Sequence, residues 1–191
     1  HTAFGVHPAV VSAGFALAVL LTLSGGIRRI SAVTEKAVPL LSALFLLSAI
    51  AAISLHLHAV PAALAAIFRD AFQFRAAAGG IMGQAIRVGV TRGVFTNEAG
   101  LGSTAVIHAA ADADTPAQQG LWGILEVFLD TLLMCTLTGL VLLTSGVELT
   151  GGDGAALYAK ALSVSLGKAG EILTAITLAL LGFASLIGWA Y

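Results

Sequence analysis

Long apolar stretches alternate with short polar ones along the chain of 191 residues. An α-helix rises about 1.5 Å per residue, so about 20 apolar residues cross a hydrocarbon core of about 30 Å. This spacing predicts membrane spans over residues 8–24, 37–57, 77–111, 118–145 and 171–191. The apolar segments 61–74 and 155–167 are too short to span, and we expect them to be helices at the membrane interface.

Proline and glycine mark several of the expected helix ends. Pro8 suits the first turn of a helix, and the Ser24-Gly25-Gly26 sequence suits its end. The charged residues of segment 27–36 predict a polar connector before the second span. Further along, Thr115 can cap a helix that has Pro116 at its first position.

The third stretch, residues 77–111, predicts an interrupted helix. Gly100 and Gly102 permit backbone conformations that break a helix, and Asn97 and Glu98 precede them directly. Two half-helices that meet near this point would together fill the bilayer. A charge in hydrocarbon is costly, so Glu98 is a candidate functional residue that lines the path of a solute or cation. Alternatively, Glu98 is neutral or pairs with Arg92 and holds the break in place.

The residues around the break offer ligands for an ion and for a carboxylate. Thr96, Asn97 and Ser103 carry oxygen atoms, which hard cations such as sodium prefer. The half-helix that begins near Ser103 would point its N-terminus at the same place. Helix N-termini bind anionic groups, including the carboxylate of an amino acid. Ordinary hydrogen bonds between helices are the alternative role for these side chains.

Polar residues also occur in the last two spans. Thr131, Cys135 and Thr138 form one weakly polar stripe, and Asp130 lies deep in the same span. Helix–helix hydrogen bonding explains them equally well. Trp189 is either an anchor at the membrane interface or part of a site with Ser185, one turn away.

A serine hydrolase is not supported by the pattern. On one helix, Ser103 and His108 would lie about 140° apart, so the two side chains could not meet directly.

Composition narrows the class of protein. Hydrophobic residues make up 58% of the chain and charged residues only 10%, whereas soluble domains carry about 25% charged residues. These values predict an integral membrane protein. The net charge of −1 gives no indication of nucleic-acid binding. The single cysteine excludes a disulfide framework, and no nucleotide or metal motif suggests a cofactor. Both ends look cut, so we expect an internal piece of a longer protein.

The segment GVTRGVFTNEAGLGS, residues 89–103, together with His108-Ala-Ala-Ala111, resembles the signature of the alanine/glycine:cation symporter family, the sodium:alanine symporters. The resemblance continues at Pro116 and Gln119-Gly120, at residues 25–30, and at the sequence Gly-Trp-Ala-Tyr, residues 188–191. It covers essentially the whole chain.

The resemblance implies an all-α integral membrane protein with a fold like that of the leucine transporter, built from two inverted repeats of five helices. The chain would be a partial transporter domain, over residues 1–191, that covers about helices four to eight. It would sit in the cell membrane as a multi-pass protein and would not be an enzyme. The alternative is a non-transporting scaffold or channel-like subunit that retains the fold.

The resemblance also implies a function and a site. The implied function is symport of a small neutral amino acid, alanine or glycine, with sodium or in some cases protons, by alternating access. Sodium would act as the coupling ion rather than as a cofactor. The expected substrate-binding residues are Phe95, Thr96, Asn97, Glu98, Gly100, Gly102 and Trp189. Ser185 lies where this architecture often places a sodium ligand.

Overall fold

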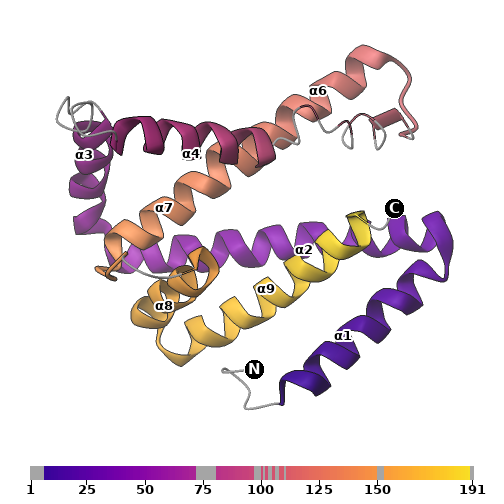
Figure 1. Ribbon diagram of the computed structural model, residues 1–191, viewed down its shortest axis with the longest axis horizontal. Coiled ribbons are helices and arrows are strands. Elements are labelled where there is room, and N and C mark those ends of the chain that lie inside the picture. The colour runs from indigo at the N-terminus through magenta and orange to yellow at the C-terminus, as the bar shows by residue number, and fades with distance from the viewer. Residues whose placement is uncertain are drawn as a thin grey trace. The chain divides into compact units, whose positions relative to one another are not determined.

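The computed structural model describes residues 7–71, 81–96, 111–149 and 153–189, together with residues 100, 102, 105, 108 and 109. Every regular element in this part of the chain is helical (Figure 1). The chain divides into two compact units. The first unit comprises residues 1–60 and 140–191, and the second comprises residues 61–139.

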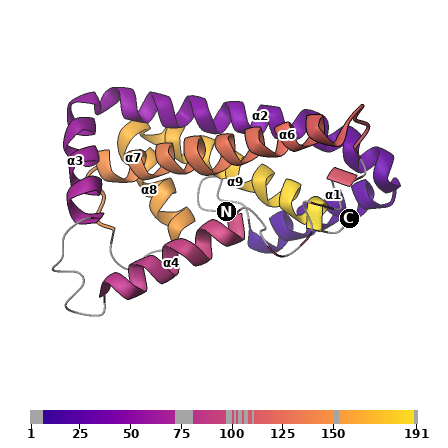
Figure 2. The ribbon, with the colours of Figure 1, turned by 90° about the horizontal axis from the view of Figure 1, so that it is seen from above.

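The first unit is a bundle of helices from both ends of the chain. Its elements are α1 (Pro8–Leu23), α2 (Gly26–Leu55), the short 3-10 helix η1 (Leu57–Ala59), α8 (Gly154–Leu166) and α9 (Lys168–Trp189). The long helix α2 packs against α8 and α9, and α1 packs against α2 and α9 (Figure 1 and Figure 2). Segments far apart in sequence therefore share one core.

Local signals explain the limits of α1. Pro8 occupies the first turn, and the His7 side chain accepts a hydrogen bond from the backbone N–H of Ala9 at 3.3 Å. The helix ends before Gly26, whose φ of +65° lies in the left-handed region. These limits agree with the ends predicted from Pro8 and the glycine pair.

The expected polar connector at residues 27–36 is wrong. These residues form the first part of α2, which runs without interruption from Gly26 to Leu55 and contains Pro39. The segment has no glycine or proline of its own, and its arginine, glutamate and lysine residues are good helix formers. Their polarity marked an exposed part of the chain, which need not be a loop.

Small residues and two aromatic pairs make the core of the first unit. Ala49, Ala52, Ala161 and Leu162 are almost fully buried. The Phe45 ring of α2 stacks on Tyr158 of α8, with ring centroids 5.5 Å apart and an interplanar angle of 17°. The rings of Phe15 and Phe183 meet edge to face, with centroids 6.0 Å apart, and join α1 to α9.

The buried environment of Tyr158 makes the free energy of unfolding depend on pH in the alkaline range. Burial raises the pKa of the Tyr158 phenol, and the neighbouring Ser48 hydroxyl lowers this pKa by less. The folded state therefore favours the neutral phenol, and its stabilisation is complete below the unfolded pKa of about 10. We expect the free energy of unfolding to fall as the pH rises above about 10. Unfolding by denaturant at pH 8 and pH 11 would measure this, and Tyr158→Phe should show a smaller loss. Equal losses in both proteins would contradict the role of Tyr158.

The second unit contains α3 (Val60–Ala71), α4 (Ile81–Thr96), α6 (Pro116–Val127), the π-helical segment η3 (Phe128–Met134) and the first half of α7 (Cys135–Thr144). The last three elements follow one another directly and make a single long helix (Figure 1). As predicted, Thr115 caps α6: its side chain accepts a hydrogen bond from the N–H of Gln118 at 3.2 Å, and Pro116 is the first helical residue.

Three helices in the described part of the chain are long and apolar enough to cross a membrane: Arg28–Leu55, Pro116–Thr144 and Lys168–Trp189. Helix α1, with 16 residues, is apolar but shorter. The predicted interfacial segments correspond to the short helices α3 and α8, of 12 and 13 residues. Their location at a membrane surface stays a prediction.

Candidate functional site

Helix α4 ends at the centre of the predicted signature. Thr96 is its last residue, and the side chain of Phe95 is 60% exposed. Beyond the helix end, the φ angles of Gly100 and Gly102 are +87° and +82°. Both values lie in the region that glycine favours and that residues with side chains rarely adopt. The backbone at these two glycines is therefore not right-handed helix.

Glycine is favoured at these two positions because of the backbone conformation, and not because a larger side chain would clash with a neighbour. A Cβ atom built on either residue would meet no other atom within 4 Å. The main chain at this point is thus open to approach. Asn97, Glu98 and Ser103 lie outside the described residues, and a helix interrupted half-way across the membrane stays a prediction.

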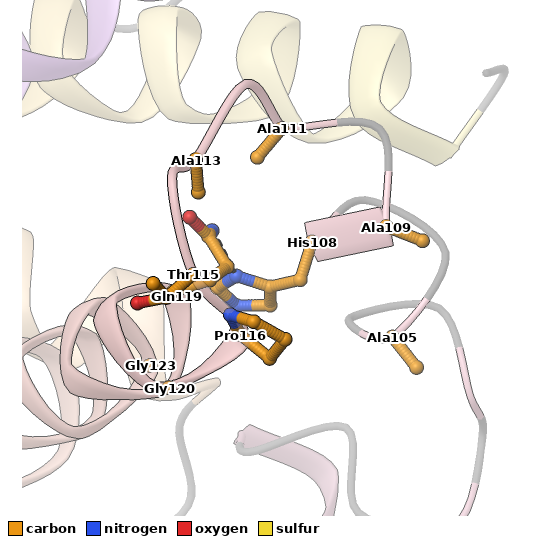
Figure 3. A pocket seen from close by; sticks show the side chains of 10 residues that line it. All are labelled: Ala105, His108, Ala109, Ala111, Ala113, Thr115, Pro116, Gln119, Gly120 and Gly123. Carbon is orange, nitrogen blue, oxygen red and sulfur yellow. Dashed lines mark hydrogen bonds between the residues drawn. The ribbon is translucent and has the colours of Figure 1, made fainter.

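His108 joins the chain after these glycines to α6. Its Nδ1 atom lies 2.6 Å from Nε2 of Gln119, and its Nε2 atom lies 3.5 Å from a carboxylate oxygen of Glu126. Figure 3 shows the imidazole directed at Gln119 within a cavity of about 570 Å³. The other lining residues are mainly alanine and glycine, so His108, Gln119 and Thr115 supply most of its polar side-chain atoms.

Sequence reasoning missed the partners of His108. It compared His108 only with Ser103 on the same segment, whereas the structure pairs His108 with Gln119 and Glu126 of α6. A signal was present, because residues 119, 123 and 126 recur at the spacing of one helix face. Gly123 between the two polar residues leaves room for the imidazole, whose nearest atom would lie 3.8 Å from a Cβ there.

The long helix of the second unit changes geometry around Asp130. Residues Phe128–Met134 are π-helical, and the backbone N–H of Cys135 bonds to the carbonyl oxygen of Asp130. Short π-helical segments within α-helices occur frequently at functional sites. The hydroxyl of Thr138 donates to the Met134 carbonyl at 2.8 Å, so this member of the polar stripe bonds within its own helix.

The remaining expected site residues lie on α9, in the first unit. Trp189 is the last residue of α9 and is 63% exposed, and Ser185 is also exposed. Phe95, Thr96 and the two glycines belong to the second unit. A single site that combines residues of α4 and α9 stays a prediction.

Oxygen atoms are the available ligands for a cation at these positions. The described residues include no group of three or more His, Cys, Asp or Glu side chains that could hold a metal ion. The hydroxyls of Thr96 and Ser185 are exposed and suit a hard monovalent cation rather than a transition metal.

The long apolar helices in the described part of the chain indicate a multi-pass membrane protein. The sequence profile of the Sodium:alanine symporter family matches residues 1–191. The chain belongs to this family. This result confirms the family inferred from the signature.

Several relatives are similar over most of the chain. The sodium/alanine symporter AgcS of Methanococcus maripaludis is 38% identical over 98% of this chain and 42% of its own length. A sodium/proton-dependent alanine carrier protein of a Bacillus species is 41% identical over 75% of this chain and 32% of its own length. A probable sodium/glutamine symporter, GlnT, of Bacillus subtilis is 39% identical over 87% of this chain and 35% of its own length. The chain thus spans at most about two fifths of these relatives.

Proposed function

We propose that the full-length protein carries a small neutral amino acid, alanine or glycine, across the cell membrane together with sodium. Transport proceeds by alternating access within a fold like that of the leucine transporter. The observation that carries this proposal is the pair of left-handed, sterically open glycines, Gly100 and Gly102, in the signature segment. Family membership and the sodium symporters among the relatives support it.

The main chain around Gly100 and Gly102 would bind the polar part of the solute. Glycine has no side chain, so a ligand can approach the backbone closely and use its N–H and C=O groups. The exposed ring of Phe95 would supply an apolar wall for a small side chain.

Sodium would bind close to the solute through oxygen ligands. Thr96, Asn97 and Ser185 offer hydroxyl and amide oxygens, and Glu98 lowers the local electrostatic potential. Coupling requires that each ligand raise the affinity for the other by the same factor. Protons are the alternative coupling ion. Alanine and glutamine both occur in the names of the relatives, so the experiment compares several amino acids.

Uptake into liposomes tests the proposal. We expect purified full-length protein to accumulate radiolabelled alanine or glycine when sodium is higher outside, and glutamine less strongly. Sodium should raise the affinity for the amino acid about 5-fold or more, which is the usual range of such coupling. Uptake that responds to neither a sodium gradient nor a pH gradient would contradict ion-coupled transport and favour a channel-like subunit, and no uptake at all would favour the scaffold.

Ser185→Ala tests the sodium ligand. Loss of the hydroxyl removes one oxygen ligand, so we expect the sodium concentration for half-maximal uptake to rise several-fold. Ser54→Ala is the matched control, because Ser54 is also exposed on a long apolar helix, and its hydroxyl donates to its own backbone at Ala51. An unchanged sodium dependence in Ser185→Ala would remove Ser185 from the ion site.

A further inference from the structure

His108, Gln119 and Glu126 form a row of polar side chains that connects the helical residues at 108–109 with α6. Figure 3 shows the first two of them, His108 and Gln119. The side chain of His108 is 24% exposed and that of Glu126 is 63% exposed. The imidazole is therefore partly enclosed, yet water can still reach it and exchange protons. Neither the proposed solute site nor the sodium site uses this row.

The donor and acceptor roles of the His108 nitrogens depend on the tautomer. In the neutral tautomer with Nδ1 unprotonated, the Gln119 amide donates to Nδ1 over 2.6 Å. The proton of the neutral imidazole is then on Nε2. This N–H faces the carboxylate of Glu126, whose nearest oxygen lies 3.5 Å away.

The same three side chains can accept a second proton without loss of a hydrogen bond. When Nδ1 becomes protonated, the Gln119 amide turns over and presents its oxygen as the acceptor, because both ends of the amide occupy nearly the same space. The imidazolium then carries a positive charge opposite the Glu126 carboxylate. Imidazole is the side chain whose ordinary charge change falls between about pH 5 and pH 8.

The part of the chain around His108 is acidic. Glu126 is the ionisable group that faces it from α6, and the connecting turn carries the exposed residues Asp112 and Asp114. The sequence from residue 93 to residue 159 contains no lysine or arginine. His108 is also the last histidine of the chain. Within this stretch, His108 is therefore the side chain that can carry a positive charge.

We propose that His108 is a proton-binding site, and that the bound proton clamps residues 108–109 onto α6 through Glu126. The consequence for transport rests on the proposed function. Alternating access requires the segment that carries the solute site to move, so the clamp slows transport when it closes at low pH. His108 is a positioning residue in this scheme, because it touches neither solute nor sodium.

Amide hydrogen exchange tests the clamp without substrate. The full-length protein in lipid nanodiscs is compared at pH 6 and pH 8, with exchange rates corrected for their intrinsic pH dependence. We expect residues 105–123 to exchange about 2- to 5-fold more slowly at pH 6, as suits a partly exposed ion pair. His108→Gln and Glu126→Gln should each abolish this difference. A wild-type protein with no difference, or a His108→Gln variant that keeps it, would overturn the proposal.

Two further variants sharpen the test. His58→Gln replaces an exposed histidine of the first unit and should keep the full pH difference. Gln119→Glu places a carboxylate against Nδ1, which holds His108 protonated, so slow exchange is expected at both pH values. Fast exchange of this variant at pH 8 would also overturn the proposal, even if His108→Gln failed to fold.

Transport measurements separate this inference from the proposed function. At a fixed sodium gradient, we expect slower alanine uptake at pH 6 than at pH 8 in the wild-type protein, and equal uptake in His108→Gln. If uptake is coupled to sodium but hydrogen exchange shows no pH-dependent protection, the clamp is overturned and the proposed function is not. Protection that depends on His108, in a protein whose uptake ignores sodium, would overturn the proposed function alone.

Discussion

Alanine at position 100 should lower amino-acid uptake by the full-length protein about tenfold or more. Gly100 has a φ of +87°, and a residue with a Cβ atom pays about 1 to 3 kcal/mol to keep such a conformation. The space around the Cβ is open, so the substitution does not create a clash. The strain instead shifts the main chain toward other conformations. Because 1.4 kcal/mol corresponds to a factor of ten, the displaced backbone groups would bind solute much more weakly.

Gly154→Ala is the matched control for this prediction. Gly154 begins α8, is exposed, and also has open space around a built Cβ, but its φ does not lie in the left-handed region. Uptake should therefore stay close to the wild-type rate. Uptake per molecule in the membrane is the measurement, with protein amount determined by quantitative blotting. Equal uptake by Gly100→Ala and Gly154→Ala would remove the main chain at Gly100 from the solute site.

Gly170→Ala should destabilise the packing of α8 against α9 in the first unit. Gly170 is buried, and a Cβ built on it would clash with the backbone carbonyl group of Leu162. Backbone atoms cannot move aside as the end of a side chain can, so α8 and α9 must separate. Overpacking of this kind costs about 1 to 3 kcal/mol, and α8 and α9 also share the core around Leu162.

Gly188→Ala is the control that separates the effect of the clash on stability from the effect of helix propensity. Both glycines lie on α9, but a Cβ at Gly188 would meet nothing within 4 Å. Alanine there gains up to about 1 kcal/mol of helix propensity, so stability should stay equal or rise. Thermal unfolding of the full-length protein in detergent compares the two variants. A Gly170→Ala protein as stable as Gly188→Ala would contradict the close approach of α8 to α9.

Much of the local structure could be predicted because its causes lie close together in the sequence. Pro8 and the glycine pair limited α1, and Thr115 with Pro116 started α6. The positions of the long apolar runs indicated the helices, since burial in lipid depends on length and hydropathy. The signature glycines Gly100 and Gly102 were expected to adopt conformations that break a helix, and both have positive φ. The prediction failed at residues 27–36, where polarity was interpreted as a loop although helix formers dominate.

The amino-acid sequence by itself determined the class of protein, the family and the approximate ends of the helices. Each of these depends on composition, on an extended motif or on residues within a turn of one another. Only the tertiary structure decided that His108 meets Gln119 and Glu126, that Phe45 stacks on Tyr158, and that Gly170 faces the Leu162 backbone. Such contacts depend on how helices approach one another to within a few ångströms. Hydrophobic periodicity does not specify that distance, because many pairings of apolar faces bury similar areas and only side-chain shape distinguishes them.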